Sequence, residues 1–479
     1  MKKTCLILIL ALFGFRAACQ TTSAPDSLKA RPWAAAAYTL TLDGIIWAYD
    51  RFIEKSEFAK ISFSTMESNL ETGFVWDSDR IATNHLGHPY NGGLYFMGAR
   101  SCGLNFWQSI PYAVGGSLLW ELFAEKEPPG LNDMIATPLA GTAFGEVFYR
   151  TANLIRDDST TGLERVGREV AACIFNPVSF VDRLLTGKLW KVNPSAGLYH
   201  DRNRFPISLS LTLGDRYMSD GGDLSVGGHY PTLKIGLSYG DAFDTAENAP
   251  FSYFKGSTYM HLGSSNTQPL FGHVGITGRL WGMDINTGSE ASEGVFGIFQ
   301  QFDFYHNRRA KEGEYNSLFN LSETVAAGPG LMFRQRAGKA TMTQSLFADF
   351  IALGAVENDN LFIIERHYNM GMGFAVKSST TVDLGPRVHL AFDAKLFYIN
   401  TRGDYDSRDK DIDPLYTDTP GDHGYSWAFV LAPSLRVDVT KHFGIELSAT
   451  RLGRNSIYRS FPDTKARTTE FLLGLHYTL

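Results

Sequence analysis

Four carboxylates in the first third of the chain stand where acid–base or cation chemistry would need them. Glu121 and Glu125 are four residues apart in an apolar stretch, so an expected helix places them on one face. Asp133 and Glu146 follow on the next expected helix. Carboxylates from two neighbouring helices can converge as a general acid–base pair or as a cation site.

Glu121 is the carboxylate that most needs an explanation, because leucines and a tryptophan surround it in the sequence. A carboxylate in such surroundings finds a partner, such as Arg100 or His88, or has a raised pKa. We therefore take Glu121, Asp133 and His88 as the candidate catalytic residues.

Two of these acidic residues also have a purely structural interpretation. Asn132 or Asp133 is placed to cap the helix that follows. Glu146 can pair with Arg150 four residues later, an interaction that stabilises a helix by only about 0.2–0.5 kcal/mol. The structural interpretation of these residues stays open beside the catalytic one.

The histidines and serines do not add a recognisable reaction centre. His85 and His88 are three residues apart in what reads as a Gly- and Asn-rich loop, with no Cys or Glu at a known zinc-ligand spacing. No serine stands in a Gly-x-Ser-x-Gly context. The sequence predicts neither a metal site nor a cofactor.

Helices are the elements that must position these side chains. Pro and Gly residues mark the ends of the expected helices. These helices cover residues 33–53, 101–124, 133–155 and 162–175, and a short fifth helix ends at Gly187. Gly141 and Gly145 lie on one face of the third, and Gly115 and Gly116 give the second a flat spot. Small residues allow backbones to approach closely, so we expect these two helices to form a tight antiparallel hairpin.

Near residue 195 the apolar period changes from helical to two, which is typical of strands with one oily and one polar face. The sharpest segments have about ten residues, enough to cross a bilayer when tilted. The fold class is therefore a mainly β protein, a transmembrane antiparallel up-and-down barrel with an α-helical N-terminal domain packed against it or plugging it. Because 340–356 alternates poorly, ten or fourteen strands stay open beside twelve. The expected strands are 205–215, 229–240, 252–263, 270–283, 294–306, 321–335, 340–356, 367–377, 382–400, 424–438, 443–453 and 468–478.

The polar faces of the expected strands should line the barrel lumen. Long connections such as 400–423 read as solvated loops on the outer side. The predicted lumen lining, charged residues that share one face, comprises Arg387, His389, Asp393, Lys395 and Glu446.

The N-terminal residues have the order of a secretory signal peptide, with Lys2 and Lys3, then an apolar stretch, then small residues up to Cys19. The predicted division is a signal peptide at 1–19, a helical periplasmic or plug domain at 20–194 and an outer-membrane barrel at 195–479. The formal net charge of −6 excludes a basic nucleic-acid-binding surface. Cys102 and Cys173 can pair in an oxidising compartment or pack as two free thiols.

The last strand carries a targeting pattern. Phe471, Leu473, Leu475 and Tyr477 fall on one face of a segment that ends at Leu479. Outer-membrane barrels resemble this, with an amphipathic final strand that the barrel assembly machinery recognises. We therefore expect this machinery and outer-membrane lipids as partners, in a Gram-negative outer membrane; a small-molecule or glycan ligand is not identified.

Four short motifs between residues 80 and 190 carry a family resemblance: His88-Pro89-Tyr90-Asn91-Gly92-Gly93, Trp120-Glu121, Asn132-Asp133 with Thr137-Pro138, and Gly141 to Gly145-Glu146. The chain resembles a family of Gram-negative outer-membrane proteins known only as domain of unknown function 3943. Members are similar in joining this helical part to a C-terminal barrel. The resemblance implies location and fold, and it implies no reaction.

Three functions are compatible with these observations. The first is a helix-plugged pore or envelope scaffold, in which the polar cluster of Arg100, Glu121, Asp133, Glu146 and Arg150 holds the helices to charged lumen residues. The alternative is a membrane-embedded enzyme that acts on an envelope lipid or glycan through the carboxylates. A third is a module that binds glycan or protein through loops such as 400–423.

Overall fold

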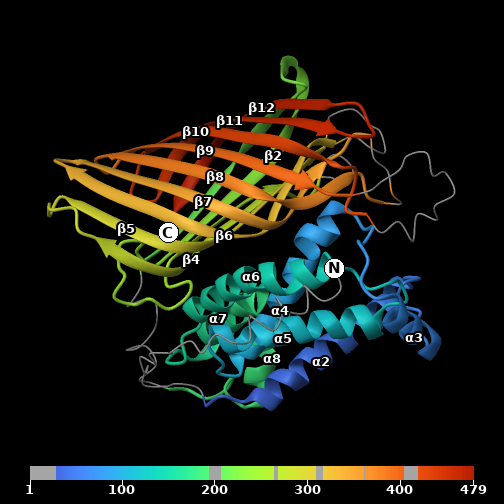
Figure 1. Ribbon diagram of the computed structural model, residues 1–479. Coiled ribbons are helices and arrows are strands. Elements are labelled where there is room, and N and C mark those ends of the chain that lie inside the picture. Colours follow the sequence, from blue (N-terminus) through green and yellow to red (C-terminus); the bar gives the residue numbers. More distant parts are fainter. Residues whose placement is uncertain are drawn as a thin grey trace.

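The computed structural model describes residues 29–193, 206–263, 268–308, 317–360, 363, 365–403 and 419–479. Seven α-helices and three short π-helical turns precede twelve strands within these ranges. The predicted signal peptide, the boundary at 194/195 and most of loop 400–423 lie outside the described residues. Figure 1 shows the strands above and the helices below them.

The C-terminal half is a closed antiparallel barrel in which each strand pairs with its neighbours in sequence and β1 pairs with β12. Twelve is the predicted count. The strands are β1 (Ile207–Asp220), β2 (Asp223–Tyr239), β3 (Phe254–His261), β4 (Phe271–Ile285), β5 (Ser292–Arg308), β6 (Ser317–Ala337), β7 (Ala340–Glu357), β8 (Tyr368–Leu384), β9 (Val388–Thr401), β10 (Gly424–Asp438), β11 (Phe443–Tyr458) and β12 (Thr464–Thr478).

The least regular of the expected strands is confirmed, and one expected strand is divided in two. The poorly alternating stretch 340–356 is strand β7, and its register shifts between Ile351 and Gly354 because extra residues bulge out of the ladder. The expected strand 382–400 spans the end of β8, a tight turn and β9. Gly385 in that turn has a φ of 68°, a conformation that costs glycine little.

The helices are α2 (Pro32–Tyr49), α3 (Phe63–Thr72), α4 (His88–Ser101), α5 (Phe106–Leu119), α6 (Asp133–Ile155), α7 (Gly162–Phe175) and α8 (Pro177–Leu185), with π-helical turns at Asp50–Glu54, Thr83–Gly87 and Trp120–Ala124. The predicted bounds of α6 and α7 are confirmed. The Gly- and Asn-rich segment after His88 is a helix and not the expected loop, because Pro89 suits a helix N-terminus and α6 packs against the glycines.

The paired glycines bring α6 against α4, and not against α5 as expected. A Cβ atom added to Gly141 would lie 2.7 Å from the Cα atom of Gly92, and one added to Gly145 would lie 2.9 Å from the carbonyl oxygen of Gly93. Gly116 of α5 faces the ring of Tyr95, also on α4. Helix α4 is therefore the central helix of the domain.

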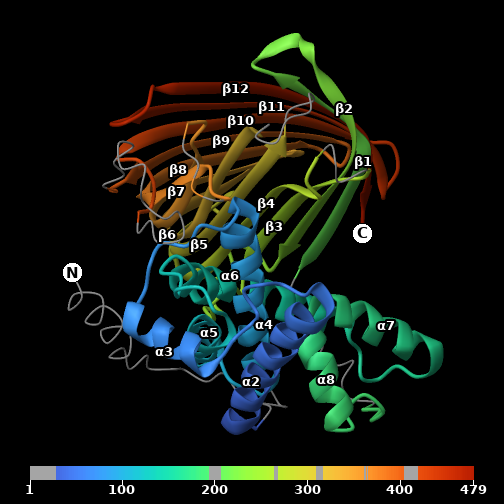
Figure 2. The same ribbon diagram turned by 90° about the vertical axis from the view of Figure 1, so that its right-hand side faces the viewer.

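The helical domain lies on the outside of the barrel. Outward-facing residues of the strands, among them Phe254, Phe302 and Phe304, share one apolar core with Phe96 and Phe144 of the helices. Phe144 of α6 meets the ring of Phe302 edge to face, with centroids 4.8 Å apart. Figures 1 and 2 show the helices along one side of the barrel wall. The helices do not occupy the lumen.

The contact runs obliquely across the wall. It includes Tyr239 at the end of β2 and Tyr368 at the start of β8, which lie at opposite rims of the barrel. At the second rim, Arg366 donates a hydrogen bond to the carbonyl oxygen of Asp77 over 2.8 Å. At the first rim, Arg150 donates to the carbonyl oxygen of Pro250 over 2.9 Å. The helical domain therefore extends along the full height of this wall.

The barrel fills its own lumen. Inward-facing residues of β5 to β11 form an apolar cluster that includes Tyr305, Phe397 and Leu452. Residues of β6 approach β11 and β12, on the opposite wall, to within 8 Å between Cα atoms. The barrel is therefore flattened, and its side chains meet across the interior.

Among the described residues, no helix combines the length and apolar character needed to cross a bilayer. Cys102 and Cys173 are both free thiols, so the disulfide alternative is not formed.

Candidate functional site

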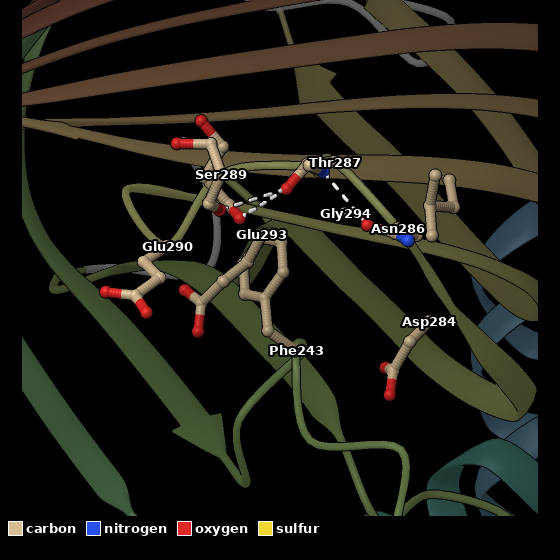
Figure 3. A pocket seen from close by; sticks show the side chains of 11 residues that line it. Phe243, Asp284, Asn286, Thr287, Ser289, Glu290, Glu293 and Gly294 are labelled. Carbon is tan, nitrogen blue, oxygen red and sulfur yellow. Dashed lines mark hydrogen bonds between the residues drawn. The ribbon is translucent and has the colours of Figure 1, made fainter.

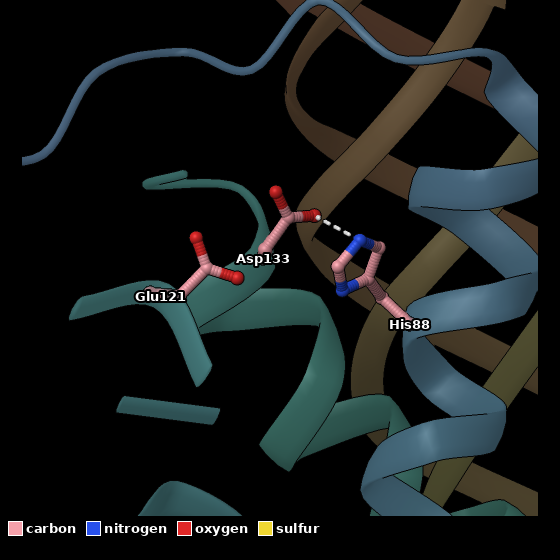
Figure 4. A group of neighbouring side chains, drawn as sticks. All are labelled: His88, Glu121 and Asp133. Carbon is pink, nitrogen blue, oxygen red and sulfur yellow. Dashed lines mark ion pairs between the residues drawn. The ribbon is translucent and has the colours of Figure 1, made fainter. Parts of the chain in front are cut away.

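The site is built from the starts of two helices and a π-helical turn. His88 is the first residue of α4, Asp133 is the first residue of α6, and Glu121 lies in the turn Trp120–Ala124 that continues α5. Figure 4 shows the three side chains pointing toward one another from these separate elements. One ligand atom of each residue lies within 4.8 Å of those of the other two.

Local hydrogen bonds fix each of these elements. The side-chain amide of Asn69 on α3 donates to the carbonyl oxygens of Glu121 and Glu125, over 3.4 and 3.0 Å, and holds the π-helical turn. Asn132 accepts a bond from the backbone N–H of Asp77 over 2.8 Å and donates to Asp133 over 2.9 Å. The predicted cap by Asn132 or Asp133 is not formed, since neither side chain accepts a bond from the first turn of α6.

Two of the three side chains are buried, and His88 is half-buried. Glu121 is 1% exposed and Asp133 is 2% exposed. The Glu121 carboxylate accepts a bond from the backbone N–H of Gly130 over 2.6 Å. The Nε2 atom of His88 lies 3.5 Å from Oδ1 of Asp133, and its Nδ1 atom lies 3.2 Å from the hydroxyl of Thr137. His88 therefore joins the start of α4 to α6.

Burial of this site favours the neutral form of each group. It lowers the pKa of His88 to about 4 and raises the pKa of Glu121 to about 8. Burial, together with the charges of Asp77 and Glu121, raises the pKa of Asp133 well above its usual range. With a pKa of about 8, Glu121 can take up and release a proton near neutral pH.

The predicted polar cluster divides into two. Glu146 lies between Arg100 and Arg150, which donate to it over 2.7 and 2.8 Å, and it forms no part of the His88 group. Thirteen residues of α6 separate Glu146 from Asp133, about 20 Å along the helix. The i,i+4 pair expected from the structural interpretation is confirmed.

The Glu146 cluster fastens the helices to the barrel. Besides Glu146, Arg150 binds the Tyr239 hydroxyl on the outward face of β2 over 3.2 Å. In the described part of the chain, Arg150 contacts the outer side of the barrel wall, where the prediction expected charged lumen residues.

The structure places four of the five residues predicted for the lumen at inward-facing positions. His389 lies between Asp383 and Asp438, at 2.6 and 2.9 Å. Inward-facing positions on β9 also include Asp393 and Lys395. Lys395 binds Asp303 at 2.5 Å. On β11, Glu446 binds Lys234 at 2.6 Å. Arg387 is exposed in the turn before β9, because the strand begins one residue later.

The largest charged cluster in the lumen was not anticipated. Lys377 binds Asp303 at 2.8 Å, lies 3.7 Å from Asp349 and also pairs with Glu323, and all four residues are buried. These residues come from β5, β6, β7 and β8. The sequence shows that these residues are charged and lie at inward positions. It gives no sign of the flattening of the barrel that brings them together.

His85 and His88 serve different surfaces despite their spacing. The ring of His85 bonds to the hydroxyl of Thr324 on β6 and packs edge to face on Tyr368, with centroids 5.4 Å apart. His85 therefore attaches the helices to the barrel wall and is not a second ligand beside His88.

A pocket of about 470 Å³ lies at the turn between β4 and β5. Figure 3 shows Asp284 on the opposite side from Glu290 and Glu293. Glu293 is paired with Arg334 at 3.0 Å. The acidic side chains of the pocket do not converge, so they do not form a catalytic or metal-binding group.

The fold defines the class of the protein: a closed twelve-stranded antiparallel β-barrel with a helical domain packed on its outer wall. Residues 73–178 match the model of a family described as a domain of unknown function, DUF3943. This match confirms the resemblance noted in the sequence. The matched segment contains His88, Glu121 and Asp133.

Three solved barrels illustrate the structural neighbours. The NanC porin is 10% identical, with a TM-score of 0.30, and the match covers 56% of this chain and 100% of the porin. OmpT of Vibrio cholerae is 7% identical, with a TM-score of 0.24 and coverages of 57% and 97%. An outer membrane channel from Pseudomonas putida F1 is 8% identical, with a TM-score of 0.26 and coverages of 57% and 94%. No curated protein matches the chain.

Proposed function

We propose that the protein is an enzyme of the Gram-negative outer membrane, in which the barrel anchors the helical domain beside it in the lipid. The His88, Glu121 and Asp133 group then acts on an envelope lipid or a lipid-linked glycan by acid–base chemistry. The observation that carries this proposal is the position of the helices on the wall that other barrels expose to lipid.

The outer surface of the helices supports a lipid environment. On α7, Leu163 is 90% exposed and Ile174 is 75% exposed, and Val166 and Val170 lie on the same face. The charged residues Arg165 and Glu169 of the same helix are buried. An amphipathic helix whose apolar side points away from its own domain is typical of a membrane-associated segment. The helical domain that holds the polar site therefore presents an apolar face on α7.

The interior of the barrel supports an open pore less well than the helical site supports an enzyme. Lys377 and its carboxylates join four strands, and the opposite walls meet. A gated pore is the second candidate, and the charged lumen favours it. Opening would have to separate these ion pairs.

Export follows from the predicted signal peptide at 1–19. The final strand β12 exposes Phe471, Leu473 and Leu475, and we propose that it is the signal for the barrel assembly machinery.

A single substitution distinguishes the enzyme from the pore. Glu121→Gln keeps the size of the side chain and removes its acid–base function. We expect mass spectrometry of outer-membrane lipids from cells carrying this variant to show loss of a lipid product, with planar-bilayer conductance equal to wild type. Glu164→Gln, on the exposed side of α7, is the matched control. An unchanged lipid profile with a changed conductance would favour the pore.

A further inference from the structure

The His88 group has the donor set of a divalent metal site. One imidazole nitrogen and two carboxylates come from α4, the π-helical turn and α6, and their ligand atoms lie within 4.8 Å of one another. Two ligands on a tetrahedral ion with bonds of about 2.1 Å are about 3.4 Å apart. The 3.5 Å between His88 Nε2 and Asp133 Oδ1 already matches that separation.

The surroundings orient these donors toward a common point. Thr137 lies 3.2 Å from Nδ1 of His88, so a hydrogen on Nδ1 can bond to its hydroxyl while the lone pair of Nε2 faces the carboxylates. Such a second partner on the far nitrogen is the usual arrangement for a metal-binding histidine. The backbone N–H of Gly130 and the side chain of Asn132 hold the two carboxylates in the same way.

The carboxyl groups of the site lack a cationic partner. Among the described residues, Glu121 and Glu125 form no ion pair with Lys or Arg, and Asp133 is paired with His88 alone. Asp77 and Asp79 add further negative charge close to Glu121. Buried carboxylates are normally paired or bound to a metal, because an isolated buried charge is costly.

We propose that His88, Glu121 and Asp133 bind one divalent transition-metal ion of the zinc type. The imidazole favours such an ion over calcium or magnesium, which take oxygen ligands. Three protein ligands leave at least one position for water or substrate, as in catalytic sites. The inference deepens the proposed function, because an ion here would polarise a lipid headgroup or activate a water molecule.

Metal binding can be measured without any substrate. Purified wild-type protein in detergent is stripped with EDTA and titrated with ZnCl₂ by isothermal calorimetry, with stoichiometry checked by elemental analysis. We expect one ion per chain. Glu121→Gln, Asp133→Asn and His88→Gln should each weaken binding at least 100-fold, and Thr137→Val should weaken it about 10-fold.

Asp43→Asn is the matched control, since Asp43 is a buried carboxylate that accepts a hydrogen bond from Tyr95 and lies outside the group. It should change the affinity less than threefold. Heat-modifiable gel mobility confirms that each variant keeps its barrel. Absence of zinc binding by wild type, or unchanged binding by both carboxylate variants, would overturn the metal site. A protein that binds zinc without altering lipids would refute the proposed function and leave the site in place.

Discussion

Two buried clusters of ionisable side chains, one in the lumen and one in the helical domain, differ in whether their carboxylates are paired with basic residues. In the lumen, Lys377 and Lys395 neutralise Asp303 and Glu323 through close ion pairs. In the helical domain, Glu121 and Asp133 lie beside one neutral histidine and, among the residues that the structure describes, form no ion pair with lysine or arginine.

The difference separates a structural role from a functional one. A paired cluster is stable as it stands and holds strands together across the lumen. A group of buried carboxyls without counter-charges costs free energy to ionise, and its presence in a folded domain points to a chemical role. Closeness of carboxylates alone would therefore not distinguish the lumen cluster from a functional site.

The largest expected effect comes from unpairing the lumen. Lys377→Met leaves three buried carboxylates short of their central cation, and breaking a buried pair in this way costs about 3–5 kcal/mol. Urea unfolding in detergent should show this loss. Lys339→Met, at an exposed turn, should change the free energy of unfolding by less than about 0.5 kcal/mol. Equal stability of the two variants would contradict the claim that ion pairs stabilise the lumen cluster.

The helical domain should be more sensitive to backbone contact than to charge. A Cβ atom at Gly92 would lie 1.6 Å from the carbonyl oxygen of Thr137, so Gly92→Ala must separate α4 from α6. We expect a loss of about 2–3 kcal/mol in the same unfolding assay. Gly115→Ala meets no atom within 4 Å and should be neutral or stabilising. Tolerance of both substitutions would contradict the close contact of the two helices.

Removing a charge from the helical cluster should stabilise the metal-free protein. The raised pKa of Glu121, about 8 against an ordinary value near 4.5, means that folding favours its protonated form. Its contribution to stability is therefore complete below about pH 4.5 and is lost as the pH rises to about 8. In EDTA, Glu121→Gln should be more stable than wild type by roughly 1–3 kcal/mol at pH 8 and equal to it near pH 4.5.

One outcome would contradict the predicted stabilisation by Glu121→Gln. If wild type and Glu121→Gln lose stability in parallel between pH 4.5 and 8, Glu121 is ionised at little cost and the contrast with the lumen fails. Glu164→Gln serves again as the exposed control.

The smallest effect on stability, and the sharpest on location, concerns α7. A spin label at Ile174→Cys, in a chain with Cys102 and Cys173 replaced by serine, should leave the free energy of unfolding within about 0.5 kcal/mol. In liposomes it should be more accessible to oxygen than to a polar nickel reagent. A label at Glu164→Cys should show the reverse, and equal behaviour of both labels would place α7 in water.

The sequence by itself determined the local elements. The alternation of apolar and polar residues predicted twelve strands, and the expected helix 162–175 has the bounds of α7. Strict period-two alternation reports that a strand has two different faces, and helix caps act within one turn. Such signals are local, so they need no knowledge of neighbours.

Only the tertiary structure decided what covers each face and which side chains meet. Phe302 and Phe304 have the same alternation as lipid-facing residues, yet the helices cover them. His88, Glu121 and Asp133 are far apart in sequence and converge because Gly92 and Gly141 let α4 and α6 touch. Hydrophobic burial is not directional, so a sequence specifies that a face must be buried without naming the surface that buries it.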